Sequence, residues 1–351
     1  MRREDGSIPA CAGEPIARAV RAIAYQALLL HQRVAILLVK TSSLGDVVHN
    51  MPAVTDVRRR WPRAHIHWLV EEAFAPLARL HPGVDEVIAV ATRRWRTGLL
   101  SASTWREIAA LRRRLRAPAY DRVVDTQGLV RSALLAAMAR GERHGYDAAS
   151  IREPLAARFY DVRHTVSREL HAVVRNRTLA SLALDSRCDG AIDYGLAPIA
   201  SDRAAPYAVL LHGTSRARKE WLESQWIGLG QGLRRAGLRV VLPWGNEAER
   251  VRSERLAQGI EGAEVLARRP LDETAQVIGG ASLVVGVDTG LLHLAAAYAV
   301  PLVGIYLATE PKLTGPVGPG PITVLGGPGQ SPAYARVLET AERMLEPFPL
   351  R

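Results

Sequence analysis

The sequence predicts an α/β protein made of two Rossmann-like domains that face each other across a central cleft. Short apolar runs alternate with amphipathic helical stretches in the first half, and the alternation restarts at residue 207 after a weakly patterned stretch at 190–206. Strands that alternate with helices are typical of parallel sheets covered by helices on both sides. A length of 351 residues suits two domains of ordinary size.

The predicted strands are apolar runs of strand length. In the first half they are VAILLV (34–39), IHWLV (66–70), EVIAV (86–90) and DRVVD (121–125). In the second half they are YAVLLH (207–212), LRVVLPW (238–244), AEVLA (263–267), SLVVGVD (282–288), PLVGIYL (301–307) and one short strand inside the Gly/Pro loop 315–332. Ligands of such sheets bind at the carboxyl ends of the strands, so the residues that follow these runs are the candidates for function.

We predict four segments along the chain. The first domain spans 34–195, the second spans 196–331, and 332–351 is a C-terminal helix that can cross back to the first domain. Residues 1–33 are an N-terminal extension in which apolar residues recur at helical spacing with arginines between them. Two interpretations of the extension stay open: a short basic amphipathic helix, or upstream sequence added by a misassigned start.

The composition is that of a globular protein with a large excess of positive charge. The net charge is +11 and the isoelectric point is about 10.2, which favours a polyanionic partner such as nucleic acid, an anionic membrane surface or a phosphorylated substrate. Aromatic residues make up only 5%, and no tract interleaves aromatic with basic residues as a single-strand binding surface would. We therefore expect phosphate or membrane lipid, and no nucleic acid. The two cysteines suggest a reduced, cytoplasmic compartment.

One long apolar window, 277–308, resembles a membrane span. Asp288 and His293 lie in its middle, and glycine and proline residues interrupt it. We interpret the window as strand, turn, helix and strand, and we predict no transmembrane segment.

The stretch VKTSSLGDVVH at 39–49 places polar residues between a buried strand and a helix. Its Asp46 is either a helix-start residue or a group that does chemistry. Lys40, Thr41 and Ser42 supply a cation and two hydroxyls at the end of the same strand.

The stretch SLVVGVDTGLLH at 282–293 has the same arrangement in the second half. Asp288, Thr289 and Gly290 begin a helix after a strand, and a helix start is a ready site for an anion. His293 falls one turn later, on the face shared with Asp288 and Thr289. The alternative is an ordinary N-cap with a hydrogen-bonded histidine.

The stretch LHGTSRARKEW at 211–221 follows another strand. Thr214 and Ser215 can donate to phosphate oxygens, and Lys219 can neutralise them. The chain has only three lysines among its 46 basic residues, so a lysine at a strand end suggests a site that needs a compact charge. Downstream, Glu249 can accept from ribose hydroxyls or simply favour the dipole of its helix.

Several sequence patterns are missing. The chain contains no G-x-G-x-x-G, no P-loop motif, no D-x-D and no cluster at metal-ligand spacing. These absences count against a dinucleotide oxidoreductase and a P-loop enzyme. If a diphosphate leaves the site, protein cations and helix starts must neutralise it, so we expect no metal and no cofactor.

Basic residues concentrate at 93–116, which hold eight arginines and one acid, Glu107. An Arg-rich helix is usually a solvated face, but Arg93, Arg94 and Arg96 directly follow a strand and suit an anionic substrate. Polar residues also follow the strand at 121–125, among them Gln127, and Arg152 lies in a later loop.

Together these motifs resemble the ADP-heptose:lipopolysaccharide heptosyltransferase family, and within it the enzymes that add the first heptose of the inner core. The stretches VKTSSLGDVVH, RRWR, DTQGLVRS, REPLA, HGTSRARKEW, LPWG and VDTGLLHLAAA follow the order and spacing of that family between residues 34 and 306. The resemblance implies the glycosyltransferase B fold. It also implies transfer of L-glycero-D-manno-heptose from ADP-heptose to Kdo of Kdo₂-lipid A, with inversion and without a metal, at the cytoplasmic face of an anionic inner membrane.

The resemblance also implies roles for individual residues. It makes the first domain the acceptor-binding one and the second the donor-binding one. Asp46 resembles the catalytic base, and Lys219 the cation on the donor diphosphate. The other implied donor contacts are Thr214, Ser215, Glu249, Asp288, Thr289, Gly290 and His293. The implied acceptor contacts are Lys40, Thr41, Ser42, Arg93, Arg94, Arg96, Gln127 and Arg152.

Two other hypotheses stay open. One is a heptosyltransferase that adds the second or a later heptose, and the other is a non-catalytic homologue that binds a sugar nucleotide or lipopolysaccharide. The Asp46 and Lys219 pairing favours an enzyme, and the TSS and RRWR elements favour the first heptose.

Overall fold

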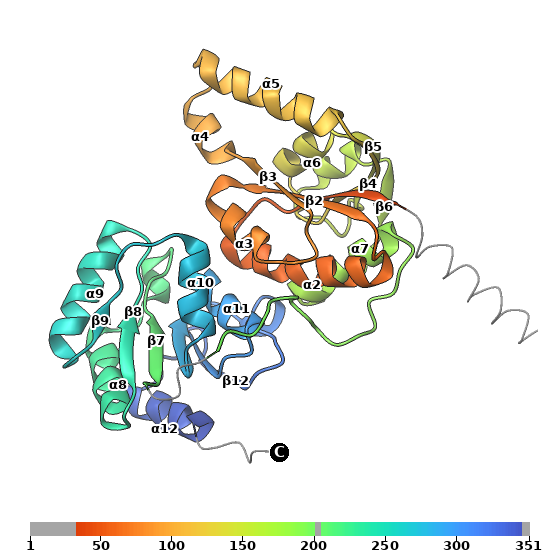
Figure 1. Ribbon diagram of the computed structural model, residues 1–351. Coiled ribbons are helices and arrows are strands. Elements are labelled where there is room, and N and C mark those ends of the chain that lie inside the picture. The colour runs from red at the N-terminus through yellow and green to blue at the C-terminus, as the bar shows by residue number, and fades with distance from the viewer. Residues whose placement is uncertain (1–32, 201–204, 346–351) are drawn as a thin grey trace, which may run out of the picture.

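The structure, a computed structural model, describes residues 33–200 and 205–345, which fold into two α/β units (Figure 1). Each unit contains one six-stranded parallel sheet, so the predicted α/β class with two Rossmann-like domains is confirmed. The predicted N-terminal extension, 1–33, lies outside these residues except for its last position. No helix in the described part of the chain is long and apolar enough to cross a membrane.

The first unit has the strand order β3-β2-β1-β4-β5-β6. Its strands are β1 (Ala35–Val39), β2 (His65–Glu71), β3 (Glu86–Val90), β4 (Ala119–Asp125), β5 (Arg140–Tyr146) and β6 (Val162–His164). Its helices are α2 (Leu44–Arg60), α3 (Ala75–Arg79), α4 (Thr92–Thr97), α5 (Ala102–Arg116), α6 (Val130–Ala136) and α7 (Ala172–Ala183), with the short 3-10 helices η1 (Glu72–Phe74) and η2 (Pro154–Phe159).

Helices cover both faces of the first sheet, and strand β1 contributes side chains to the core on each face. Successive strand residues point to opposite faces of a sheet. Ile36 and Leu38 join the core cluster that includes residues of α2 and α7, and Leu37 and Val39 join the cluster that includes residues of α5. All four side chains are fully buried, which is why this strand is a continuous apolar run in the sequence.

The second unit has the strand order β12-β11-β10-β7-β8-β9. Its strands are β7 (Tyr207–Leu211), β8 (Arg239–Leu242), β9 (Glu264–Val265), β10 (Leu283–Val287), β11 (Leu302–Tyr306) and β12 (Ile322–Gly326). Its helices are α8 (Glu223–Arg235), α9 (Glu247–Gly259), α10 (Leu271–Gly279), α11 (Gly290–Ala297) and α12 (Tyr334–Leu345), with the 3-10 helices η3 (Ala217–Lys219) and η4 (Pro311–Leu313). The apolar window 277–308 is thus the end of α10, β10, α11 and β11, as predicted.

Helix α12 packs within the second unit, against α8, β10 and β11. Two glycines of α8 make room for it: a Cβ on Gly228 would lie 2.9 Å from the Tyr334 ring, and one on Gly232 would lie 2.3 Å from Leu338 Cδ2. The sequence analysis predicts that the C-terminal segment can cross back to the first domain, whereas α12 packs on the second unit. The apolar side chains of α12 face α8 and the core of the second unit, where Val337 and Ala341 are fully buried.

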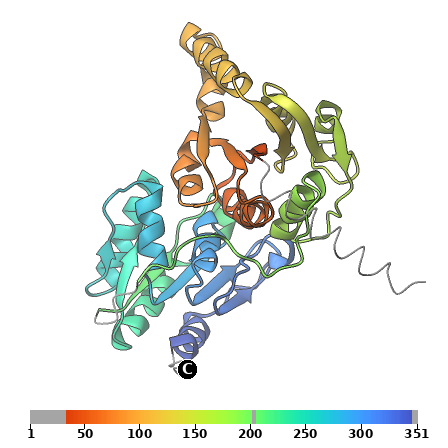
Figure 2. The same cartoon turned by 45° about the vertical axis from the view of Figure 1, so that its right-hand side comes forward.

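The two units meet mainly through α2 and α11, and also through α3 and α10. Both views place α2 beside α11 (Figure 1, Figure 2). The chain segment between the units adds a further contact, because the Tyr194 hydroxyl donates to the Val317 carbonyl at 2.7 Å. The amino ends of α2 and α11 face each other, since a Cβ on Gly45 would lie 3.7 Å from Gly290 Cα. Each helix follows a central strand of its own sheet.

Candidate active site

The candidate site lies where the loops after β1 and β10 lead into α2 and α11. Two glycines allow the amino ends of these helices to touch. A Cβ on Gly45 would lie 2.8 Å from His293 Cδ2, and a Cβ on Gly290 would lie 2.8 Å from Leu44 Cβ. Any larger residue at either position would force its neighbours to shift. Gly290, predicted as a ligand contact, is therefore also a packing residue of the junction.

Asp46 caps the amino end of helix α2 with one of its two carboxylate oxygens. Its Oδ2 accepts from the Ser43 backbone N–H at 2.7 Å and from the Ser43 hydroxyl at 3.0 Å, which forms a capping box. The other oxygen, Oδ1, has no hydrogen-bond partner among the described residues, and the side chain is half-buried. The capping geometry and an available oxygen thus coexist in one side chain.

Lys40 lies beneath this loop and is buried. Its ammonium donates to the Thr126 carbonyl at 2.8 Å and to Asn176 Oδ1 at 3.3 Å. Burial lowers the pKa of Lys40, and the carboxylates of Asp46 and Asp125 oppose that shift. Lys40, which was predicted to contact the acceptor, therefore forms its hydrogen bonds within the protein and links the end of β1 to the end of β4 and to α7.

Gln127 holds the loop that carries Thr41 and Ser42. Its Oε1 accepts from the backbone N–H of both residues at 3.1 Å. Sequence reasoning did not single out Arg131, which follows on α6 and donates to the Ser42 hydroxyl at 2.5 Å. The structure thus brings the predicted residues of the loops after β1 and β4 together. A basic residue at the start of the helix that follows a strand is the signal that could have found Arg131.

On the second unit, Asp288 is the centre of a polar group. Its Oδ2 accepts from the Lys219 ammonium at 2.5 Å and from the Thr309 hydroxyl at 2.6 Å. The Thr214 hydroxyl donates to the Asp288 carbonyl at 3.2 Å. Three strand ends, β7, β10 and β11, therefore converge, and three of the predicted donor residues lie together.

Thr309 is a member of this group that the sequence analysis missed. It follows strand β11 by three residues, as Thr214 follows strand β7. A hydroxyl placed after the strand next to β10 was the available signal, but no recognisable motif surrounds it.

The remaining predicted donor residues surround this group less closely. Glu249, near the start of α9, accepts from the Gly245 N–H at 2.7 Å, and its carboxylate packs on Gly213, where a Cβ would lie only 2.7 Å from it. Thr289 is the N-cap of α11 and its side chain makes no capping bond. Ser215 is exposed and forms no hydrogen bond with the residues that the structure describes.

The predicted arginines differ in how they are bound. Arg94 forms ion pairs with Glu72 at 3.3 Å and with Glu107 at 2.9 Å. Arg93 lies over the Phe74 ring, 5.0 Å from its centroid, and Arg96 is exposed; neither has an acidic partner among the described side chains. All three lie on α4, which follows β3.

Arg152 is also exposed, but it lies in a different part of the first unit, in the bends before η2. Its neighbour Glu153 accepts from the Val130 N–H at 2.8 Å, which holds this loop against the start of α6.

Three histidines from separate elements meet at the junction, and sequence reasoning singled out only His293. The rings of His49 and His293 are 4.3 Å apart and those of His49 and His171 are 5.5 Å apart. His171 Nδ1 accepts from the Val173 N–H at 3.2 Å, so its proton is on Nε2, which donates to the Gly315 carbonyl at 3.0 Å. His171 therefore links the first unit to the second.

The charges of both units act on His293. Burial, the largest cause, lowers the pKa of His293 to about 4. The carboxylates of Asp288 and Asp46 oppose this shift, whereas His171 and Lys219 add to it. Gly45, the neighbour of Asp46, lies against the His293 ring, and the Lys219–Asp288 pair stands just before the helix that carries His293, so groups from both units surround one buried imidazole. A carboxylate, a lysine and two helix starts can together remove a proton and stabilise an anion.

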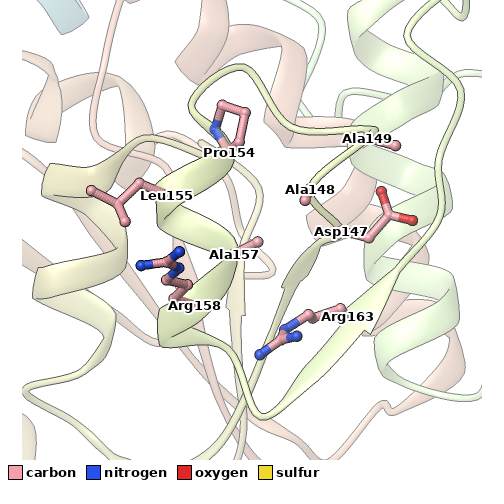
Figure 3. Close-up of a pocket in the computed structure, with 8 residues that line it drawn as sticks. All are labelled: Asp147, Ala148, Ala149, Pro154, Leu155, Ala157, Arg158 and Arg163. Carbon is pink, nitrogen blue, oxygen red and sulfur yellow. The ribbon is translucent and has the colours of Figure 1, made fainter.

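A separate hollow of about 690 Å³ lies at the β5–β6 edge of the first unit, lined by the loop after β5, by η2 and by β6 (Figure 3). Arg158 borders it from η2, and Arg163 of β6 and Asp147 of the loop after β5 border it from the opposite side (Figure 3). None of the predicted site residues lines this hollow. Within the described ranges, no three His, Cys, Asp or Glu side chains are grouped so that they could hold a metal ion.

Comparison with known proteins agrees with this arrangement. The family model described as glycosyltransferase family 9 (heptosyltransferase) matches residues 108–339. Lipopolysaccharide heptosyltransferase 1 of Salmonella typhimurium is 44% identical over 289 residues, which cover 81% of this chain and 91% of that protein. The protein of the same name from Pseudomonas aeruginosa is 46% identical over 288 residues, which cover 81% of both.

Solved structures give the same result. The E. coli heptosyltransferase WaaC with ADP has a TM-score of 0.83 and 40% identity, covering 89% of this chain and 100% of that one. The same enzyme with ADP-2-deoxy-2-fluoro heptose has a TM-score of 0.80 and 39% identity, covering 89% and 99%. The predicted glycosyltransferase B fold is confirmed by these neighbours. The chain is a glycosyltransferase, and it belongs to glycosyltransferase family 9, the heptosyltransferases.

Proposed function

We propose that this enzyme transfers L-glycero-D-manno-heptose from ADP-heptose to Kdo of Kdo₂-lipid A, with inversion at the anomeric carbon and without a metal ion. The single observation that carries the proposal is the contact of the two helix starts: Gly45, next to Asp46, lies against the His293 ring of α11, and the Lys219–Asp288 pair stands just before that helix. The names of the relatives and the ADP ligands of the neighbouring structures support the donor and the reaction class.

The second unit binds the donor in this proposal. Lys219 neutralises the diphosphate, and the hydroxyls of Thr214 and Ser215 and the start of α11 supply further donors to its oxygens. Asp288 positions Lys219 through the 2.5 Å contact and is itself held by Thr309. Glu249, fixed at Gly245, accepts from the ribose hydroxyls. Stabilising the leaving diphosphate is the part of catalysis that these groups perform.

The first unit supplies the base. Asp46 has one oxygen bonded to Ser43 and one without a partner among residues 33–200 and 205–345. The capping contact therefore fixes the orientation of the carboxylate, while Oδ1 can accept a proton from the acceptor hydroxyl. Inversion requires the base and the leaving group on opposite sides of the anomeric carbon. The two roles therefore fall on different units, and the α2–α11 junction sets their separation.

The acceptor is anionic, which suits the basic elements near the Asp46 loop. Arg93 and Arg96 have no acidic partner in the described structure and are available for phosphate or carboxylate groups. Arg94 must exchange Glu72 or Glu107 for the acceptor. Thr41, Ser42 and Arg152 are the further proposed contacts, while Lys40 and Gln127 act by holding the loop.

The proposal places the enzyme in the cytoplasm, at the inner-membrane surface where a lipid A acceptor is anchored. The net charge of +11 favours attraction to such an anionic surface.

The direct test is incubation of the purified enzyme with ADP-heptose and Kdo₂-lipid A, followed by the mass and the anomeric configuration of the product. We expect one heptose to be added with inversion. A product that forms only from an acceptor that already carries heptose would instead assign the enzyme to a later step, and no product from either acceptor would overturn the proposal.

A further inference from the structure

The connection between α4 and α5 exposes large apolar side chains at the edge of the molecule. Leu99 and Trp105 are 52% and 57% exposed, and Leu100 is fully exposed. We call residues 98–105 the α4–α5 tip. The other strongly exposed large hydrophobic residues of the described chain occur singly along the sequence. Figures 1 and 2 both show α5 projecting at the side of the first unit away from the second (Figure 1, Figure 2).

Several polar groups of the tip form hydrogen bonds with other groups of the tip. The Trp105 indole N–H donates to the Leu99 carbonyl at 2.8 Å. The Ser101 backbone N–H donates to the Gly98 carbonyl at 2.9 Å, and the Ser101 and Ser103 hydroxyls are 2.6 Å apart. A buried polar group is costly only when it lacks a partner. The tip can therefore enter an apolar medium without leaving these groups unpaired.

The surroundings of the tip are strongly basic. Residues 93–116 hold eight arginines, and Glu107, their one acid, is engaged by Arg94 and by the Trp95 indole. Arg114 is paired with Glu86 at 2.5 Å. The arginines without an acidic partner in the described structure are Arg93, Arg96, Arg106, Arg112, Arg113 and Arg116.

From these observations we propose that the α4–α5 tip docks onto a bilayer that contains anionic phospholipids. Leu99, Leu100 and Trp105 enter the interface between headgroups and acyl chains, and the unpaired arginines of α5 contact the headgroups. Stable attachment to a membrane takes two signals, and an apolar insertion beside a basic patch provides both. The inference deepens the proposed function, on which it rests for the choice of membrane.

A bilayer fits better than a single lipid molecule because of the length of α5. The helix has 15 residues, which corresponds to roughly 22 Å at the usual rise per residue. Its unpaired arginines lie from Arg106 to Arg116, spread over most of that length, whereas one headgroup can contact only a part of it. Docking at α5 also keeps α4, with the proposed acceptor contacts, beside the membrane surface.

The test is flotation of the full chain with vesicles of phosphatidylethanolamine and phosphatidylglycerol, compared with vesicles of phosphatidylcholine alone. We expect binding to the first that weakens as salt is added, and little binding to the second. The double variant Leu99→Ser/Leu100→Ser should bind about tenfold more weakly or worse. Its control is Leu222→Ser, which changes a 65% exposed leucine of the second unit and should bind as the unaltered enzyme does.

A second pair of variants tests the charge. Arg112→Gln/Arg113→Gln should bind about tenfold more weakly or worse, because each basic residue near an anionic surface changes affinity by roughly fivefold. The control, Arg235→Gln/Arg336→Gln, removes the same charge from exposed positions of α8 and α12 and should change binding little. An equal loss in control and test pairs would show that only the net charge matters and would overturn the proposal.

Two further outcomes would also overturn it: absence of binding to anionic vesicles, or binding only when Kdo₂-lipid A is included in them. Heptose transfer to a detergent-dispersed acceptor keeps this test separate from the proposed function. The Leu99→Ser/Leu100→Ser and Arg112→Gln/Arg113→Gln variants should transfer heptose to that acceptor at the rate of the unaltered enzyme. If they bind vesicles poorly but transfer normally in detergent, the docking proposal holds. If the unaltered enzyme docks but transfers no heptose, only the proposed function fails.

Discussion

His49 of α2 and His293 of α11 pack edge to face across the junction of the two units, with ring centroids 4.3 Å apart. His49 Nε2 and His293 Nδ1 are buried and have no hydrogen-bond partner among the described residues. The contact joins the helix that carries the proposed base to the helix that faces the donor. Both imidazoles are therefore held neutral at the point where the units must meet.

This contact predicts that stability falls in mild acid. Burial is the largest cause that lowers the pKa of His293 to about 4 and the pKa of His49 well below its ordinary value. An unfolded histidine takes up a proton near pH 6.5, so the unfolded state binds more protons than the native state between that pH and about 4. The free energy of unfolding should therefore decrease as pH falls through this range.

The measurement is the thermal unfolding midpoint as a function of pH, for the unaltered enzyme and for His49→Gln/His293→Gln. The double variant should lose less stability between pH 6.5 and pH 4.5, because fewer native groups resist protonation. It should retain part of the dependence, since burial also lowers the pKa of His81 and His212 to about 4. An unchanged slope in the double variant would contradict the assignment.

Gly45→Ala should impair transfer more than it impairs folding. The new Cβ would lie 2.8 Å from His293 Cδ2, and overpacking of this kind typically costs about 1–3 kcal/mol. The shift would disturb the contact of α2 with α11 beside Asp46, so kcat/KM should fall about tenfold or more. Gly290→Ala, which meets Leu44 Cβ at 2.8 Å, should behave alike.

Gly190→Ala is the matched control, because nothing lies within 4 Å of the added Cβ and the backbone there is not left-handed. Steady-state kinetics and thermal unfolding of all three variants check this prediction. Equal activity in all three would mean that close contact of α2 and α11 is not needed for turnover.

Lys219→Ala should weaken donor binding. A charge-assisted hydrogen bond contributes about 1.5–3 kcal/mol, so the Kd of ADP-heptose should rise about tenfold to a hundredfold. Lys219→Arg should recover part of the loss, since it keeps the charge and changes the geometry. Titration calorimetry with ADP-heptose measures the effect, and an unchanged Kd in Lys219→Ala would remove the lysine from the diphosphate site.

Thr309→Val tests the residue that the sequence did not reveal. Its hydroxyl donates to the Asp288 oxygen that also binds Lys219. Without it, Asp288 is less well positioned, and we expect a several-fold rise in the KM for ADP-heptose, corresponding to about 1 kcal/mol. An increase confined to the KM for the acceptor would argue against this placement.

Transfer should continue at the same rate in excess EDTA. The proposal assigns the charge of the leaving diphosphate to Lys219 and to the start of α11, and the sequence contains no D-x-D. Initial rates with EDTA and with added Mg²⁺ check this. Loss of activity in EDTA that Mg²⁺ restores would assign part of that role to a metal.

The sequence predicted the buried strands well and the polar edge of the first sheet poorly. Strand β1 is buried on both faces and therefore forms one apolar run. Strand β5 contains Arg140, Glu142 and Arg143, whose side chains face solvent or ion-pair partners, and β6 has only three residues. Their pairing depends on neighbours that a local pattern does not contain, so neither was predicted as a strand.

The sequence likewise predicted some features of the candidate site and missed others. Asp46 lies in the first turn of a helix, Thr214 and Asp288 follow strands closely, and Lys219 lies in the connection after β7. The topology therefore predicted that these residues gather at the carboxyl ends of the strands. Lys40 also follows a strand, but its side chain is buried against Thr126 and Asn176, and a sequence does not report burial of a single ammonium group. The histidine cluster arises from three segments far apart in the chain, which no local motif describes.

Ser43→Ala separates the two roles of Asp46. It removes the hydroxyl that donates to Asp46 Oδ2 at 3.0 Å but keeps the carboxylate and the backbone bond at 2.7 Å. We expect a loss of stability of about 1 kcal/mol, typical of a helix cap, together with a small loss of transfer. Thermal unfolding and single-turnover rates measure the two effects, and a loss of transfer as large as that of Asp46→Asn would mean that the cap is what matters.

The most direct test of the account is single-turnover heptose transfer by Asp46→Asn, followed by mass spectrometry, alongside calorimetric binding of ADP-heptose. Asparagine keeps an oxygen that can accept from the Ser43 N–H, so the helix start is retained while the base is lost. We predict that transfer slows about a hundredfold to ten-thousandfold, while the Kd of ADP-heptose changes little. Transfer at a rate close to that of the unaltered enzyme would contradict the assignment of Asp46 as the base.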